Sequence, residues 1–373
     1  MQSRSKYIIA GIVILLVAFV GWYLKTILLY LVVSIVLSLI GQPIARFFSK
    51  IRIKKFKLSP SLFSLMSLAT LLLLIIALFS LFIPLLVEEA RIISKIDPNQ
   101  VVTTFREPLQ NLEFSLQKYQ ISYGNGEPIE KFIASKLTSI LGFQEVSGYA
   151  QQMLSFTTSI VAAFFSISFI TFFLMKDEKA IYNIAIMLTP PKHISAIKEI
   201  MHDTKIILTR YFIGILFDML FVATITAIGL SIFGVKNALL IGLFAGIMNV
   251  IPYIGPLLSL GFALLVGVSS SLELEFYSQL LPLMGIISIV FLVVQMLDAL
   301  IFQPLVVSNT VKAHPLEIFL VILSAGTIAG ISGMVVAIPV YTIVRIIAKE
   351  FLHNFKIVQK LTEDLEEATE DQQ

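Results

Sequence analysis

The chain has 373 residues, of which 57% are hydrophobic and only 14% are charged, and its mean hydropathy is +0.92. A soluble chain of this length cannot bury so much apolar surface, so the composition predicts a polytopic membrane protein. The absence of cysteine excludes disulfides, thiolate catalysis and iron–sulfur sites. The formal net charge of +3 is small, and we expect no nucleic-acid partner.

Six apolar stretches are long enough to cross a bilayer as single helices, which takes roughly 20 residues. They cover 7–24, 26–45, 61–87, 151–175, 211–233 and 279–303. The first stretch follows a basic N-terminus like a signal peptide, but its length and the lack of a small-residue cleavage site favour a retained span. The sequence therefore predicts an all-α polytopic membrane protein with about six plain spans.

Two further apolar runs, 238–271 and 315–347, are too long for one span and are interrupted near the middle. Pro252 and Pro256 interrupt the first run, and glycines interrupt the second. Each half has about 15 residues, which is short for a crossing at 1.5 Å per residue. We expect two broken or re-entrant helical segments, while full crossings in one or both runs are the alternative.

The segment 88–150 is the only large polar part of the chain. Its apolar residues recur at spacings of three and four, as in an amphipathic helix: Val101, Val102, Phe105, Leu109, Leu112, Leu116 and Tyr119. A turn at 123–128 precedes a second such helix that begins near Ile129. We expect these helices on the outer face of the membrane or on a neighbouring subunit, which predicts a homo-oligomer.

Orientation follows from the basic residues of the connecting loops. The loop 46–60 carries six basic residues and no acid, so it should be cytoplasmic, and the basic residues near the C-terminus predict that both termini are cytoplasmic. In this topology 238–271 enters from outside and 315–347 from inside. The chain then divides into an N-terminal hairpin with a third span, the amphipathic segment, a transport core and an acidic tail, at 1–87, 88–150, 151–349 and 350–373.

The stretch "NVIPYIGP" lies in the middle of the first broken run. In hydrocarbon, non-helical backbone persists only where protein or a water-filled cavity covers it. Paired broken segments indicate a substrate site in secondary transporters, and this stretch supplies the candidates Asn249, Pro252, Tyr253, Gly255 and Pro256. The alternative is that both runs are kinked helices that only pack. Alanine at Gly267, away from the break, is expected to do little.

Carboxyl groups inside two predicted spans are further candidates. A carboxylate within a membrane is costly and should face a partner or water. Asp218 is isolated in its span, and pairing with Arg210 or with a neighbouring helix would explain it without a function. A second polar cluster consists of Gln295, Asp298, Gln303 and Pro304. The alternative for Asp298 is a position near the cytoplasmic interface, where water would solvate it.

The second broken run opens on His314 and Pro315. A histidine at an interface is usually a polar anchor, although a protonation switch is the alternative. Glycines 326 and 330 have a spacing that is typical of close helix packing. Together with Gly333, they are candidates for a second break that lines a solute pathway.

Enzyme signatures are absent from the sequence. It contains no G-x-S-x-G, no H-E-x-x-H and no phosphate loop, and its four histidines are scattered. Asp218 and Asp298 are a conceivable protease pair, but the local motifs of intramembrane proteases are missing. We expect no enzyme, no cofactor and no metal site.

Three stretches together resemble the autoinducer-2 exporter family of bacterial transporters: "NVIPYIGP" (249–256), "QMLDALIFQPLVVSNTVKAHPL" (295–316) and "AGTIAGISGMVVAIPV" (325–340). The resemblance implies an inner-membrane permease that exports the quorum-sensing signal autoinducer-2 in some members and exchanges sodium or lithium for protons in others. Its motif positions fall on Asn249, Pro252, Tyr253, Gly255, Pro256, Gln295, Asp298, Gln303, Pro304, His314, Pro315, Gly326, Gly330, Gly333 and Pro339. Ala299 replaces an asparagine that is frequent in the family, which weakens the argument for ion coordination by Asp298.

Three hypotheses follow for a chain without an ATPase motif. The first is a secondary or passive transporter that exports a small polar molecule, such as autoinducer-2, past the backbone at 249–256 and 326–333. The second is a sodium(lithium)/proton antiporter that uses Asp298 or Asp218. The third is a structural membrane scaffold whose broken runs only pack.

Overall fold

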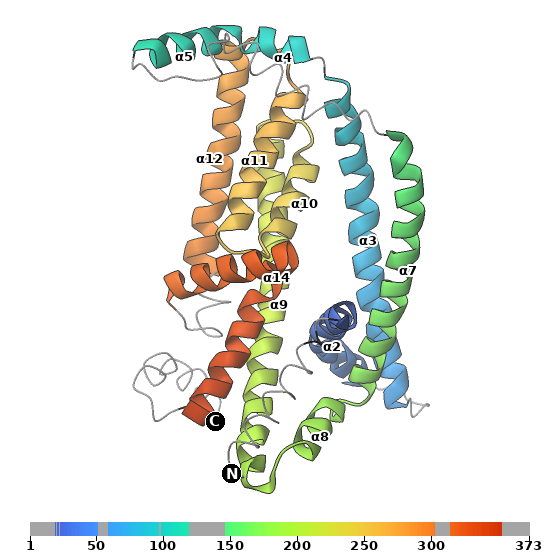
Figure 1. Ribbon diagram of the computed structural model, residues 1–373. Helices are drawn as coiled ribbons and strands as arrows, with labels where there is room; N and C mark the ends of the chain where they lie inside the picture. Colours follow the sequence, from blue (N-terminus) through green and yellow to red (C-terminus); the bar gives the residue numbers. More distant parts are fainter. Residues whose placement is uncertain are drawn as a thin grey trace. The chain divides into compact units, whose positions relative to one another are not determined.

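The computed structural model describes residues 19, 21, 23–50, 59–96, 98–118, 146–302 and 314–352 (Figure 1). All regular elements in these ranges are helical. Among the described residues five helices are long and apolar enough to cross a membrane, and a sixth span results if one bent helix pair is counted. The predicted all-α polytopic fold is confirmed. The predicted span 7–24 lies almost wholly outside the described residues.

The chain forms two compact units, one of residues 1–75 and 148–201 and the other of 76–147 and 202–373. The first unit contains α2 (Lys25–Lys50), the start of α3 (Pro60–Ser94), α7 (Val146–Lys176) and α8 (Ala180–Met187). Small residues let its helices approach closely, as is common in membranes. The Ser67 hydroxyl donates a hydrogen bond to the Gly41 carbonyl over 2.7 Å.

Helices α4 (Pro98–Thr104) and α5 (Arg106–Lys118) belong to the second unit and replace the single helix predicted over this stretch. The prediction was wrong because Pro108 would clash with the Thr104 carbonyl in a continuous helix. The chain therefore ends α4 at Thr104 and places Pro108 in the first turn of α5, where its missing N–H is not needed. The second predicted amphipathic helix lies outside the described residues.

The amphipathic face of α4 and α5 packs on its own chain. The Phe105 ring meets Phe276 edge to face at 5.2 Å, and the Thr104 hydroxyl donates to the Leu272 carbonyl over 3.0 Å. Leu109 is buried. Part of the apolar face that suggested a subunit contact is thus covered within the second unit.

The first broken run forms a helical hairpin of α10 (Ala238–Met248) and α11 (Ile254–Ser269), which follows the long helix α9 (Ile194–Ile232) (Figure 1). The 11 residues of α10 extend about 16 Å, roughly half of a hydrocarbon core. The predicted break at Pro252 and Pro256 is therefore confirmed. The hairpin will be called the tip hairpin, with its tip at 249–253 and its open end, the base, at 237 and 269–270.

The tip hairpin is packed tightly between α9 and α12 (Leu281–Leu297). A Cβ added to Gly242 or to Gly246 would meet backbone carbonyls of α9. Ile287 on α12 is fully buried, and an added Cβ at Gly267 would meet its side chain. Gly267 is therefore not the neutral position that the sequence suggested. Gly261 on α11 is a neutral position, since an added Cβ there meets no atom within 4 Å.

The second broken run is α14 (Pro315–Leu352), which bends at Ala329 and Gly330. Gly330 has φ 61° and ψ −147°, a conformation that is essentially restricted to glycine. The two arms approach each other closely beside the bend: a Cβ added at Gly333 in the second arm would meet the Ala325 carbonyl of the first. At the open end the Tyr341 hydroxyl donates to Glu317 Oε2 over 2.7 Å. The predicted second break is confirmed.

Candidate functional site

The tip of the tip hairpin is a tight turn rather than a kinked helix. Tyr253 has φ 66° and ψ −46°, and the Ile254 N–H donates to the Pro252 carbonyl over 2.8 Å. This is a γ-turn with a bulky residue at positive φ, a conformation that costs about 1–3 kcal/mol and occurs mainly at functional sites. The surrounding chain therefore holds the tip in a strained shape.

The prolines and the glycine of the tip each fit this turn. Pro256 is the third residue of α11, where a helix has no use for a backbone N–H. Pro252 supplies the carbonyl that closes the γ-turn. A side chain at Gly255 would overlap the Met248 carbonyl at the end of α10. The residues that break the apolar run are the ones that build the tip.

Three polar side chains meet beside the tip: Asp218 of α9, Asn249 at the end of α10, and Asp298. The Asn249 Nδ2 donates to Asp218 Oδ2 over 2.8 Å. Asp298 begins η4 (Asp298–Phe302), a π-helical segment after α12, and its carboxyl group interacts directly with that of Asp218. We call these three residues the acidic triad.

The acidic triad decides between the alternatives raised by the sequence. Asp298 is only 2% exposed, so it is not solvated at an interface. Asp218 pairs with neighbouring helices and not with Arg210, whose side chain is exposed. The two carboxyl groups singled out separately are therefore partners.

Asp218 and Asp298 cannot both be ionised without a compensating positive charge nearby. Two negative charges about 4 Å apart repel by about 4 kcal/mol at an effective dielectric constant of 20. A proton or a bound cation has to relieve this repulsion. The buried Oδ1 of Asp218 has no hydrogen-bond partner among the described residues, which leaves an oxygen for such an occupant. Tyr211, a buried residue two turns earlier on α9, also interacts electrostatically with Asp218.

Aromatic contacts fix the elements around the acidic triad. Phe221 of α9 stacks on Phe302 of η4 with ring centroids 4.1 Å apart. The Tyr253 ring meets Phe319 on the first arm of α14 edge to face at 6.1 Å. The tip thus contacts both α9 and the second broken segment, although the sequence pattern gave no sign of Phe319.

The other sequence candidates are distributed more widely. Gln295 is half-buried near the end of α12. His314 caps α14, since its Nδ1 accepts the Leu316 N–H over 3.2 Å and Pro315 opens the helix. Gly326, Gly330 and Gly333 lie at or near the bend of α14, and Pro339 lies in its second arm. Gln303 and Pro304 lie outside the described residues.

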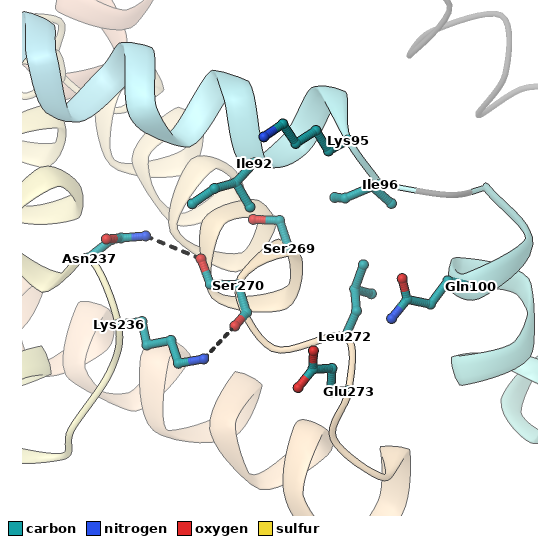
Figure 2. A pocket seen from close by; sticks show the side chains of 10 residues that line it. All are labelled: Ile92, Lys95, Ile96, Gln100, Lys236, Asn237, Ser269, Ser270, Leu272 and Glu273. Atoms are coloured by element: carbon teal, nitrogen blue, oxygen red, sulfur yellow. Dashed lines mark hydrogen bonds between the residues drawn. The ribbon is translucent and has the colours of Figure 1, made fainter.

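The described residues hold no group of three or more His, Cys, Asp or Glu side chains that could bind a metal ion. Near the base of the tip hairpin lies a cavity of about 540 Å³, walled by the end of α3, the start of α4, and the turns before α10 and after α11 (Figure 2). Sequence analysis missed the buried Glu89 nearby, because "EE" at the end of an apolar run looks like the start of a polar segment.

Most of the chain resembles bacterial transport proteins. A family model described as "AI-2E family transporter" matches residues 9–353. "Putative transport protein YueF" of Bacillus subtilis is 31% identical over 230 residues, which are 61% of this chain and 60% of YueF, less than two thirds of its length. "Putative transport protein YrrI" of the same organism is 26% identical over 70% of this chain and 71% of YrrI.

"Putative permease PerM" of Escherichia coli K12 is 26% identical over 178 residues, which are 47% of this chain and 47% of PerM. The matched range of the family model includes both broken segments and all three members of the acidic triad. With this match and five helices of membrane-spanning length and apolarity among the described residues, the chain is a multi-pass membrane protein that belongs to the AI-2E transporter family.

Proposed function

We propose that this membrane transporter exchanges sodium or lithium ions for protons at the acidic triad. The observations that carry the proposal are the interaction of the Asp218 carboxyl group with that of the buried Asp298 and the hydrogen bond of 2.8 Å from the Asn249 amide to Asp218. Such a pair needs a positive occupant, and either a proton or a monovalent cation satisfies it. Two occupants that exclude each other at one site are what an exchanger requires.

The surroundings of the acidic triad support this proposal. The tip lies about 16 Å from the start of α10, a depth near the middle of a bilayer, where many transporters place their sites. Broken helices there leave carbonyl groups free to coordinate a cation. The Asn249 amide holds Asp218 in place and stabilises its charged form when the proton leaves.

Export of a small polar molecule, such as autoinducer-2, is the second candidate. The description of the matching family favours it. In that case the Asn249 amide and the free backbone groups of the tip would bind the solute, and the transporter would be passive or driven by the proton. A structural scaffold is the third reading, for which the broken segments would only pack.

We further propose the bacterial inner membrane as the location, with both termini in the cytoplasm and α4 and α5 outside. The six basic residues of 46–60 support this orientation. We also retain the homo-oligomer as a proposal. Phe114 of α5 is 71% exposed, so part of the amphipathic face is uncovered by this chain.

Purified protein in liposomes tests the proposed exchange. Sodium-loaded liposomes are diluted into sodium-free buffer with the membrane potential clamped, and an internal dye reports pH. We expect the interior to acidify as sodium leaves, and we expect Asp218→Asn and Asp298→Asn to abolish the signal. Gly261→Ala is the matched control, because the added methyl group meets no neighbour.

The other outcomes separate the alternatives. Autoinducer-2 movement without a sodium-dependent pH change would overturn the exchange proposal in favour of export. Neither activity in correctly inserted protein would favour the scaffold. Acidification that persists in both asparagine variants would remove the acidic triad as the site.

A further inference from the structure

A second buried carboxyl group lies at the opposite end of the tip hairpin. Glu89 of α3 is only 2% exposed, although it follows a long apolar helical stretch. A buried carboxylate is costly unless hydrogen bonds satisfy it. Its Oε1 accepts the Ser269 hydroxyl over 2.7 Å, and its Oε2 accepts the Asn237 Nδ2 over 2.6 Å. The Ser270 hydroxyl approaches Oε1 at 3.5 Å.

These donors come from both ends of the tip hairpin. Asn237 directly precedes α10, Ser269 ends α11, and Ser270 follows it. The base is also closed by its own bonds, since Asn237 Nδ2 donates to Ser270 Oγ over 3.2 Å and Lys236 Nζ to the Ser270 carbonyl over 2.9 Å (Figure 2). One side chain of α3 therefore joins the two ends of the hairpin.

The donor pattern requires an acceptor at position 89. The Asn237 N–H₂ group and two serine hydroxyls lie within hydrogen-bond distance of the Glu89 carboxylate, whose two oxygens accept without donating; the Ser269 hydroxyl also lies 2.9 Å from the Val266 carbonyl. Glutamine has a single acceptor oxygen, which can face either Asn237 or the serine hydroxyls, and its N–H₂ group then faces the other side. Hydrogen bonds to an ionised acceptor are also about twice as strong as neutral ones.

Among the described residues, the base has more side-chain hydrogen bonds than the tip. At the tip, the hydrogen bond from Asn249 to Asp218 accompanies the ring contact of Tyr253. We propose that Glu89 is a positioning residue that clamps the base of the tip hairpin to α3 and thereby sets where the tip meets Asp218. The clamp itself rests on contacts alone, and its effect on transport rests on the proposed function.

A side-chain exchange tests the clamp. In Glu89→Gln, the single glutamine oxygen can accept from Asn237 or from the serine hydroxyls but not from both sides, so one side loses its acceptor. In Glu89→Gln with Asn237→Asp, the glutamine N–H₂ can donate to the new carboxylate, while the glutamine oxygen still accepts the two serine hydroxyls. The double variant thus restores the contact with its donor and acceptor exchanged. Ser278→Ala is the control, since this hydroxyl donates to the exposed Glu275 and not to the clamp.

The first readout does not depend on transport. The chain has no cysteine, so Ser271→Cys, at a buried position beside the base, introduces a single thiol for maleimide labelling. We expect Glu89→Gln to raise the labelling rate about tenfold, as for a lost charged hydrogen bond. The double variant should return it to within about twofold of the parent. Ser269→Ala, a milder change, should give an intermediate rate if Glu89→Gln does not fold.

The second readout is the sodium dependence of exchange in liposomes. In Glu89→Gln the displaced tip should raise the KM for sodium about tenfold, and the maximal rate should fall by a smaller factor. The double variant should restore the KM. A double variant no better than Glu89→Gln, or parental labelling in Glu89→Gln, would overturn the clamp. Absence of exchange in the parent would overturn the proposed function instead, and labelling would still decide the clamp.

Discussion

At the scale of single residues, the acidic triad shows how much an unremarkable amide can matter. Asn249 caps the end of α10, and its side-chain amide donates the hydrogen bond that links the tip to Asp218. Asp218 would otherwise carry its charge beside Asp298 with little compensation. The amide therefore decides whether a negative charge on Asp218 is tolerated when the proton departs.

Asn249→Ala should impair sodium exchange more than it impairs folding. Losing a hydrogen bond to a charged group costs about 1.5–3 kcal/mol, so the KM for sodium should rise about tenfold or more. The proton, which neutralises Asp218 without needing the amide, should then occupy the site in preference to sodium. Liposome assays over a sodium series measure this, with Gly261→Ala as the control. An unchanged KM would contradict the role of the amide.

The three members of the acidic triad were predicted from the sequence as separate candidates, but the interaction between Asp218 and Asp298 was not predicted. Asp218 and Asp298 were both predicted because an acid in an apolar span is expensive wherever it lies. Their contact depends on the packing of α9 against α12 and η4, through contacts such as Phe221 on Phe302. A single sequence carries no signal for such a long-range pairing.

At the scale of elements, the breaks were predictable because proline and glycine act locally. Both predicted interruptions were found, at Pro252 to Pro256 and around Gly330. The prediction of one helix through Phe105 failed because the apolar period continues across a break that Pro108 imposes. Periodicity records which face is buried and does not record whether the backbone is continuous.

Replacing both Pro252 and Pro256 by alanine should nearly abolish transport while the protein still inserts in the membrane. The change restores two backbone N–H groups, so α10 can extend through the tip and draw Asn249 away from Asp218. Pro256→Ala alone should do little, since this proline lies in the first turn of α11. Transport rate and membrane abundance are compared for all three chains. Wild-type transport by the double variant would refute the tip as the site.

At the scale of the whole molecule, the apolar surface is explained by the lipid that surrounds a membrane protein. Many large apolar side chains are exposed, among them Leu73 at 66% and Leu292 at 60%, as expected for helices that face lipid. Composition alone predicted this class of protein. The buried Glu89 was missed because charge at the end of an apolar run is usually solvated, and only the hairpin base, about 150 residues later, explains it.

The predicted orientation can be checked in intact cells. Lys50→Cys and Asn125→Cys each introduce the single thiol of the chain. We expect a membrane-impermeant reagent to label position 125 from outside and position 50 only after lysis, because the basic loop 46–60 stays in the cytoplasm. Labelling of both positions from outside would overturn the orientation.

The backbone of Gly330 has a consequence for sequence variation. No atom lies within 4 Å of a Cβ placed there, so a library of variants judged by space alone would accept every small residue at this position. Its φ of 61° excludes them, because the Cβ of an L-amino acid clashes with its own backbone in this region. Gly261 has equally empty surroundings in an ordinary helix and should accept them freely. Two glycines with the same neighbourhood would therefore differ in mutational tolerance, and selection at Gly330 would act on chain geometry alone.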